Sequence, residues 1–444
     1  MRRSAWRFLF ISADIRNRLL ISLIILMIYR LVAHVPVPGV NREAIAGVLA
    51  GSGQTLFGLL DLLSGGTVSN FSVLAMGVYP YITAQIILQL LTPIIPALQQ
   101  RMEDDPREAR KWQEKWTYYL AVPMAALNAI GQIRLFQQYA IGTPGGVLNY
   151  PLGPNLQTLT TVITMTAGTM FAIWMGELIS EYGVRNQGLS LIIFAGIVSR
   201  VPTNLGRLLV DEQNRVPMLA FIIFIMVLTI FAIVYVQEGR RNVPVMYPGR
   251  RVGNRMSMPV KGTLPLMVNM AGMIPLIFAQ SLLTFPAVVA QFIIGSDNPT
   301  VNSIAVWLQN TFGGISNTYW ILYFLFVVVF TFFYTDVVFS QQNYGENLKR
   351  AGAQVPGVTK GAATQRYLTR VLRRITLPGA LFLGIVAVMP FLVGLIWPVG
   401  GSNTGLLLVS SSGLLIVVGV IRDLYRSIEA ELKLRGYDAA LLVR

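Results

Sequence analysis

The chain has 444 residues, of which 54% are hydrophobic and only 12% are charged, and its formal net charge is +15. A soluble domain does not sustain this balance, so the composition indicates an integral membrane protein. Cysteine is absent, which excludes disulfides and thiolate metal sites. A single histidine, His34, argues against a histidine-rich metal centre or an imidazole proton relay.

Apolar runs recur along the chain, most of them close to the roughly 20 residues that span about 30 Å of hydrocarbon. The first run follows a basic stretch but has no small-residue cleavage site before Pro36, so we interpret it as a retained span. We predict ten spans, near residues 19–35, 73–91, 118–136, 156–175, 189–201, 217–236, 264–284, 319–339, 376–397 and 406–421.

The connecting segments divide sharply by charge. Those on the side of the N-terminus hold 29 lysines and arginines, whereas those on the other side hold three. This asymmetry predicts that both termini are cytoplasmic, and it accounts for much of the net charge without nucleic acid. The predicted inside segments are 1–18, 92–117, 176–188, 237–263, 340–375 and 422–444.

The spans form two sets of five, in residues 19–201 and 217–421. Two sets with an odd number of spans have opposite orientations, as in an inverted repeat around a central pathway. The fifth span is short, and the seventh contains Gly272 and Pro275, so both differ from a plain apolar helix. Short or broken segments of this kind often line a pathway, although ordinary irregular helices would give the same pattern. We therefore predict an all-α integral membrane protein with about ten transmembrane helices in two pseudo-symmetric inverted halves around a central pore.

A shorter apolar segment, residues 56–63, lies between the first two spans and is followed by Ser64, Gly65 and Gly66. It is too short to cross a bilayer, so it either re-enters the protein or lies in the interface. Asp61 would be costly against lipid and favours a protein-lined or aqueous funnel.

Two long motifs stand out in the chain. Residues 72–91 read SVLAMGVYPYITAQIILQLL, and residues 174–194 begin with WMGELISEYG and end with GLSLIIF. Both resemble the signatures of the SecY translocon family. Shorter matches, such as NMAG at 269–272 and LRGY at 434–437, follow in family order, so the resemblance covers nearly the whole chain. It implies a protein-conducting channel for secretion across, and lateral insertion into, the bacterial cytoplasmic membrane.

Three positions depart from the family pattern. The loop at 183–188 is one residue longer than usual, Thr359 stands where the family has an arginine, with Lys360 beside it, and Met267 stands where a lysine is common. These departures concern cytoplasmic contacts and leave the resemblance intact.

The resemblance implies a ring of apolar side chains at the centre of the pore. Such a ring holds back ions at rest by dewetting, and it needs no chemistry. Lipid contact or ordinary packing is the alternative for each residue taken alone. The implied ring residues are Val78, Ile82, Leu189, Ile193, Ile277 and Ile416.

The resemblance also implies a plug in the outer funnel and a lateral gate, at which spans two and three part from spans seven and eight. Gln85, Gln89 and Asn269 are polar groups within predicted spans, so they are assigned to the gate, although structural hydrogen bonding alone would also explain them. The plug is assigned to Leu56, Phe57, Leu59, Leu60, Leu62, Leu63, Ser64, Gly65 and Gly66.

The inside segments 237–263 and 340–375 carry clustered basic residues. Attraction to anionic membrane lipids explains part of this charge. The resemblance adds docking of a ribosome, through its phosphates, and of a SecA-like ATPase motor, and it implies small SecE-like and SecG-like subunits and signal-sequence-bearing polypeptides as further partners. The docking residues are assigned as Arg240, Arg241, Arg250, Arg251, Arg255, Lys349, Arg350, Thr359 and Lys360.

Two other classes of function are possible for a polytopic chain. A secondary transporter needs intramembrane ionisable or ion-coordinating residues, whereas the acidic residues here lie mainly in loops. An intramembrane enzyme needs a nucleophile with a base, and Ser410, Ser411 and Ser412 have no such partner in the sequence. We expect no enzyme activity, no cofactor and no metal. We also expect the energy for transport to come from a partner or from the membrane potential.

Overall fold

The computed structural model describes most of the chain. The described residues are 13–41, 45, 71–139, 150, 153, 155–185, 187–210, 215–248, 251–252, 255–256, 260–294, 298–313, 316–396 and 404–434. The predicted plug, residues 56–66, lies outside them.

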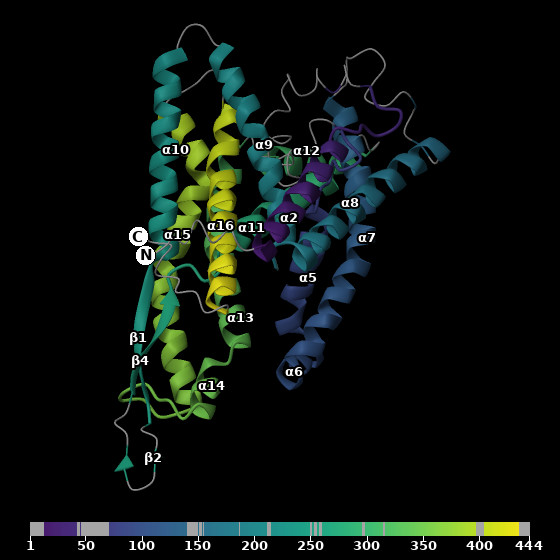
Figure 1. Ribbon diagram of the computed structural model, residues 1–444. Coiled ribbons are helices and arrows are strands. Elements are labelled where there is room, and N and C mark those ends of the chain that lie inside the picture. The colour runs from purple at the N-terminus through teal and green to yellow at the C-terminus, as the bar shows by residue number, and fades with distance from the viewer. Residues whose placement is uncertain are drawn as a thin grey trace.

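A helix stands at each of the ten predicted spans (Figure 1). By length and composition, the helical segments Leu156–Tyr182, Asn317–Arg350 and Ala362–Val393 can each cross a membrane, and shorter apolar helices cover further predicted spans. The ten helices are α2 (Ala13–Val32), α5 (Tyr79–Ile94), α7 (Pro106–Tyr139), α8 (Leu156–Tyr182), α9 (Gly188–Val210), α10 (Arg215–Glu238), α11 (Ile274–Ile293), α13 (Asn317–Gln341), α15 (Ala362–Ile396) and α16 (Thr404–Leu434).

Two helices extend beyond their apolar runs. Helices α7 and α15 begin 12 and 14 residues before the predicted spans 118–136 and 376–397. At the start of α7, the Asp105 carboxylate accepts hydrogen bonds from the backbone N–H groups of Arg107 and Glu108, at 3.0 and 3.2 Å. Hydropathy marks where a helix lies in lipid, whereas capping groups of this kind fix where it begins.

The seventh span begins later than the sequence predicted. Residues 260–267 form strand β4 (Val260–Met267), and α11 begins only at Ile274. Between them Gly272 has a φ of +65°, and the Asn269 amide bonds both the N–H and the carbonyl of Gly272, at 2.9 and 3.0 Å. Gly272 and Pro275 therefore start the helix, and the prediction that they interrupt it was wrong.

The two long inside segments form one folded unit rather than separate loops. Strand β1 (Arg240–Tyr247) pairs antiparallel with β4, and the short strands β2 (Arg251–Val252) and β3 (Arg255–Met256) pair near the tip of this hairpin. Met246 exchanges backbone hydrogen bonds of 2.8 and 2.9 Å with Gln354. We call β1, β4, helix α14 (Tyr344–Arg350) and the start of α15 the docking module.

A small apolar core holds the docking module together. Val243 and Val245 of β1 pack with Leu348 of α14 and Leu368 of α15, and all four are buried. The hairpin, α14 and the short helix α6 (Pro96–Asp104) lie at one end of the molecule (Figure 1). Another short helix, α12 (Pro299–Phe312), packs against α11.

The helices pack mainly as two groups, with α16 also contributing Ile416 and Val420 to the core of the first. One core joins α2, α5, α8 and α9 through Tyr29, Ala84, Ile173 and Ile192. A separate core joins α10, α11, α13, α15 and α16, with Tyr323 near its centre. The groups meet along two lines, where α11 packs against α7 and α5 and where α16 packs against α9. We call the first of these lines the seam.

We predict that Gly168→Ala destabilises the closely packed first half. Gly168 of α8 faces the backbone of Val73, so an added Cβ requires the backbone to move. Overpacking of this kind costs about 1–3 kcal/mol. The matched control is Gly419→Ala on α16, where the nearest atom to the new Cβ is the flexible Met273 Sδ at 3.6 Å. Thermal unfolding in detergent should shift for Gly168→Ala and not for the control, and equal shifts would contradict the packing.

Candidate functional site

All six residues assigned to the ring lie within the described part of the chain. Val78 immediately precedes α5 and Ile82 lies in its first turn, Leu189 and Ile193 lie near the start of α9, and Ile277 lies in the first turn of α11. The sixth residue, Ile416, lies within α16 and is 2% exposed. The ring residues therefore come from four helices, two in each half.

These side chains meet in the interior. Val78, Ile193 and Ile416 are buried in one apolar cluster, and Ile82 and Leu189 pack against it. Ile277 lies in a neighbouring cluster that shares Ile82 with the first. The six residues thus form a continuous set of apolar contacts that joins the two halves.

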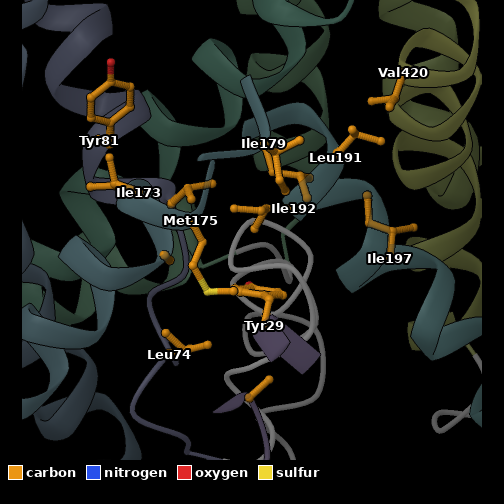
Figure 2. Packing of buried hydrophobic residues seen from close by; sticks show 14 of the residues in the cluster. Tyr29, Leu74, Tyr81, Ile173, Met175, Ile179, Leu191, Ile192, Ile197 and Val420 are labelled. Atoms are coloured by element: carbon orange, nitrogen blue, oxygen red, sulfur yellow. The ribbon is translucent and has the colours of Figure 1, made fainter. Parts of the chain in front are cut away.

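Further apolar residues support this meeting point. Figure 2 shows Leu191, Ile192 and Ile197 of α9 beside Val420 of α16, all members of the same buried cluster. Because these supporting residues are also buried, the ring side chains rest on packed neighbours. We call the six ring residues with this packing the constriction.

The constriction offers no group for bond-making chemistry. Its six side chains are hydrocarbons, and among the described residues no three His, Asp or Glu side chains are placed to hold a metal ion. An apolar narrowing of this kind resists wetting, and flexible aliphatic side chains can yield to a larger chain that passes between them. The arrangement is therefore suited to closing a pathway.

The three residues assigned to the gate lie on two segments of the chain. Gln85 and Gln89 are half-buried on α5. Asn269 is buried in the turn before α11, where its side-chain amide bonds the N–H and the carbonyl of Gly272. Its amide shapes the start of α11, so Asn269 precedes this helix rather than lying within it.

The structure adds polar residues at the seam that the sequence analysis missed. Gln280 and Ser281 of α11 are 1% and 6% exposed, and the Ser281 hydroxyl has no hydrogen-bond partner within the described part of the chain. Tyr319 and Tyr323 of α13 are fully or almost fully buried, and their hydroxyl oxygens have no hydrogen-bond partner within the described part of the chain. Their spacing of four residues, which places them on one helix face, was the available signal.

Four of the nine assigned docking residues lie on the docking module. Arg240 and Arg241 begin β1, Lys349 and Arg350 end α14, and all four are exposed. Glu346 forms ion pairs with Lys349 and Arg350, at 3.8 and 3.7 Å.

Of the remaining docking residues, Thr359 and Lys360 lie in a turn, and Arg251 and Arg255 lie in short strands. Thr359 and Lys360 are exposed in the turn before α15, where the Thr359 carbonyl accepts a 2.8 Å hydrogen bond from Thr364. Arg251 and Arg255 are described only as backbone, in β2 and β3, and Arg250 lies outside the described residues.

The sequence was compared with known protein families and with curated proteins. The SecY family profile matches residues 72–425. A curated relative, protein translocase subunit SecY of Aquifex aeolicus strain VF5, is 38% identical over 439 residues, which cover 97% of each chain.

Solved structures share the fold. A structure described as a protein-conducting channel aligns with a TM-score of 0.64 at 19% identity and covers 94% of this chain and 92% of its own. Sec61 in the canine ribosome–channel complex from the endoplasmic reticulum aligns over the same fractions with a TM-score of 0.61, also at 19% identity.

We predict that a short thiol crosslinker joins Ile82→Cys to Ile277→Cys in the resting protein. The two side chains pack in one cluster across the seam, and the chain has no other cysteine to react. The double variant should give one crosslinked species in native membranes, read as a mobility shift after cleavage between residues 82 and 277. Ile82→Cys with Ile223→Cys, an exposed site on α10, is the control. Equal yields for the two pairs would contradict the constriction.

Proposed function

The chain belongs to the SecY family, and from that premise we propose that it is the channel subunit of a bacterial protein translocase, a membrane protein that conducts polypeptides and is not an enzyme. The observation that carries the proposal is the constriction, which both halves of the molecule build from aliphatic side chains. Exported chains cross the cytoplasmic membrane through it, and hydrophobic segments leave sideways into lipid. A secondary transporter is not favoured, because the central residues offer no group that could coordinate an ion.

Closure in this proposal depends on the six ring side chains. At rest they exclude water, which gives ions a dewetting barrier. When a polypeptide enters, the same side chains rotate away and close around it, because aliphatic groups contact any sequence without a specific bond. The constriction therefore accepts many substrates and still limits leakage.

The seam is the proposed lateral gate. Helices α5 and α7 lie on one side, and α11, with α13 behind it, lies on the other. Hydrogen bonds between helices in a membrane contribute about 1 kcal/mol each, enough to bias a closed state and still permit opening by a signal sequence. Gln85 and Gln89 of α5 are the residues we propose for this role.

The plug proposal rests on the sequence alone. The run of leucines and phenylalanine at 56–63 and the glycines that follow it suit a short helix that enters the outer funnel and can be displaced. The plug would seal the side of the constriction opposite the docking module.

The proposed partners follow from the charge at the other end of the molecule. The exposed cations of the docking module suit the phosphates of a ribosome and the acidic surface of a SecA-like motor. The Sec61 relative found in a ribosome–channel complex supports the first of these. We place this end and both termini in the cytoplasm, and we expect SecE-like and SecG-like subunits to complete the assembly.

We predict that Ile416→Asn weakens closure. Burying an amide without partners costs about 1–3 kcal/mol, so the protein shifts toward open states in which water satisfies the amide. Resting ion conductance in planar bilayers should rise, as should export of substrates with defective signal sequences.

The control for Ile416→Asn is Ile223→Asn on α10, where the side chain is 46% exposed at the outer surface of the bundle. If both variants leak equally, or if Ile416→Asn lowers expression without changing signal selectivity, Ile416 only packs and the ring assignment fails.

We predict that Lys360→Glu impairs motor-driven export more than Thr359→Ala does. Lys360 is an exposed cation in the turn before α15, whereas Thr359 contributes its backbone carbonyl to the start of α15, and alanine keeps that carbonyl. In vitro translocation into inverted membrane vesicles measures both variants. Small and equal effects would show that the motor binds elsewhere.

A further inference from the structure

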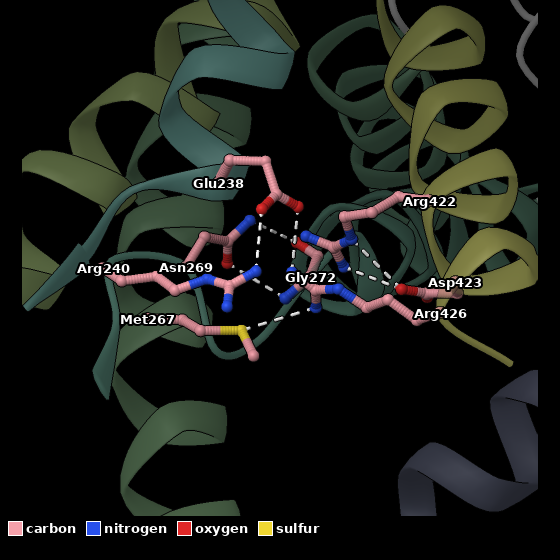
Figure 3. Close-up of polar contacts among 8 residues, drawn as sticks. All are labelled: Glu238, Arg240, Met267, Asn269, Gly272, Arg422, Asp423 and Arg426. Atoms are coloured by element: carbon pink, nitrogen blue, oxygen red, sulfur yellow. Dashed lines mark hydrogen bonds and ion pairs between the residues drawn. The ribbon is translucent and has the colours of Figure 1, made fainter. Parts of the chain in front are cut away.

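A cluster of polar contacts connects the docking module to helix α16 (Figure 3). Its centre is Glu238, the last residue of α10. Arg240 at the start of β1 donates to Glu238 Oε2 at 2.9 Å, and Arg426 of α16 donates to Glu238 Oε1 at 3.0 Å. The Glu238 carboxylate therefore joins β1 to α16 through Arg240 and Arg426, which are 186 residues apart in the sequence.

Arg426 also contacts the second strand of the hairpin. Its Nη1 lies 3.5 Å from the Sδ of Met267, the last residue of β4. The neighbouring arginine, Arg422, bonds Asp423 at 3.0 Å, so it has its own carboxylate. Among the described charges drawn in Figure 3, Arg426 is thus the cation of α16 that contacts β4 directly and reaches β1 through the Glu238 carboxylate.

The elements joined here lead directly to the constriction. Arg426 lies ten residues after Ile416 on the same helix, which is about 15 Å along its axis. In the other direction, β4 continues through the Asn269–Gly272 turn into α11, whose first turn holds Ile277. Two ring residues therefore sit on elements that the cluster holds together.

We propose that Arg426 is a positioning residue that couples the docking module to the constriction, an inference that rests on the proposed channel function. A partner that binds the docking module shifts β1 and β4, and the link from Glu238 to Arg426 makes α16 follow. The movement reaches Ile416 and Ile277 together, so docking favours the open state. Without the link, a partner still binds, but less of its binding free energy reaches the ring.

Met267 brings no charge to this cluster, so the two cations on Glu238 are Arg240 and Arg426. Where a lysine stands at this position of β4, a cation from the hairpin itself can satisfy the carboxylate. Here the position holds a thioether, and the second cation comes from α16 instead. The ion pair between Glu238 and Arg426 therefore connects the end of α10 to α16.

The solvent exposure of the ion pair sets how much its loss should reduce the stimulation of export. The side chains of Arg426 and Glu238 are 28% and 46% exposed, so water screens the pair and its contribution is modest. Loss of such a pair should reduce the stimulation of export by the motor about two- to fivefold.

The test compares Arg426→Ala, Arg426→Lys and the double variant Arg426→Ala/Met267→Lys with the unchanged chain in proteoliposomes. The purified SecA-type ATPase is the probe, and the readouts are its Kd and the ratio of stimulated to basal export. We expect an unchanged Kd, a ratio about two- to fivefold lower for Arg426→Ala, and recovery in Arg426→Lys. The double variant returns a cation to the hairpin but not to α16, so it should fold normally and keep the low ratio.

Three results would overturn the proposal: an unchanged ratio in Arg426→Ala, a loss that weaker motor binding explains, or full recovery in the double variant. Ile416→Asn, measured in the same vesicles, separates this failure from failure of the channel proposal. If Ile416→Asn leaks and Arg426→Ala does not change the ratio, only the coupling is wrong. If Ile416→Asn does not leak, the constriction itself is wrong.

Discussion

Contact between aliphatic side chains of two separate helix groups is the interaction on which the rest of the structure depends. Neither half contains the constriction alone, because Val78 and Ile193 come from the first group and Ile277 and Ile416 from the second. Such contacts are non-directional and individually weak, so they can close, part and close again without breaking a specific bond. A movement between the halves therefore changes the pore and the seam together.

Polar groups lie around this apolar centre. Gln280 and Ser281 are buried on α11, and Glu238 and Arg426 join the end of α10 to α16 within the second group. Glu238 and Arg426 are 188 residues apart in the sequence. In the proposed channel, closure depends on the apolar contacts, and the polar contacts at the edges modulate it.

Sequence patterns predicted the ten helices because hydropathy and the charge of the connecting segments act locally along the chain. They did not predict where several helices begin, since Asp105 caps α7 and the Asn269–Gly272 turn starts α11. The resemblance supplied the ring positions, which the structure brings together. The link from Glu238 to Arg426 could not be predicted, because it depends on how the end of α10 packs against a residue of α16 that follows 188 positions later in the sequence.

The central claim is that the constriction is dry at rest and opens only around a substrate. Ile193→Cys tests it most directly, because this side chain is 5% exposed and the chain has no other thiol. The measurement is its rate of reaction with a membrane-impermeant thiol reagent, added from either side of sealed vesicles, at rest and during substrate transit. The account predicts protection from both sides at rest and faster labelling while a chain passes. Rapid labelling of the resting protein would contradict it.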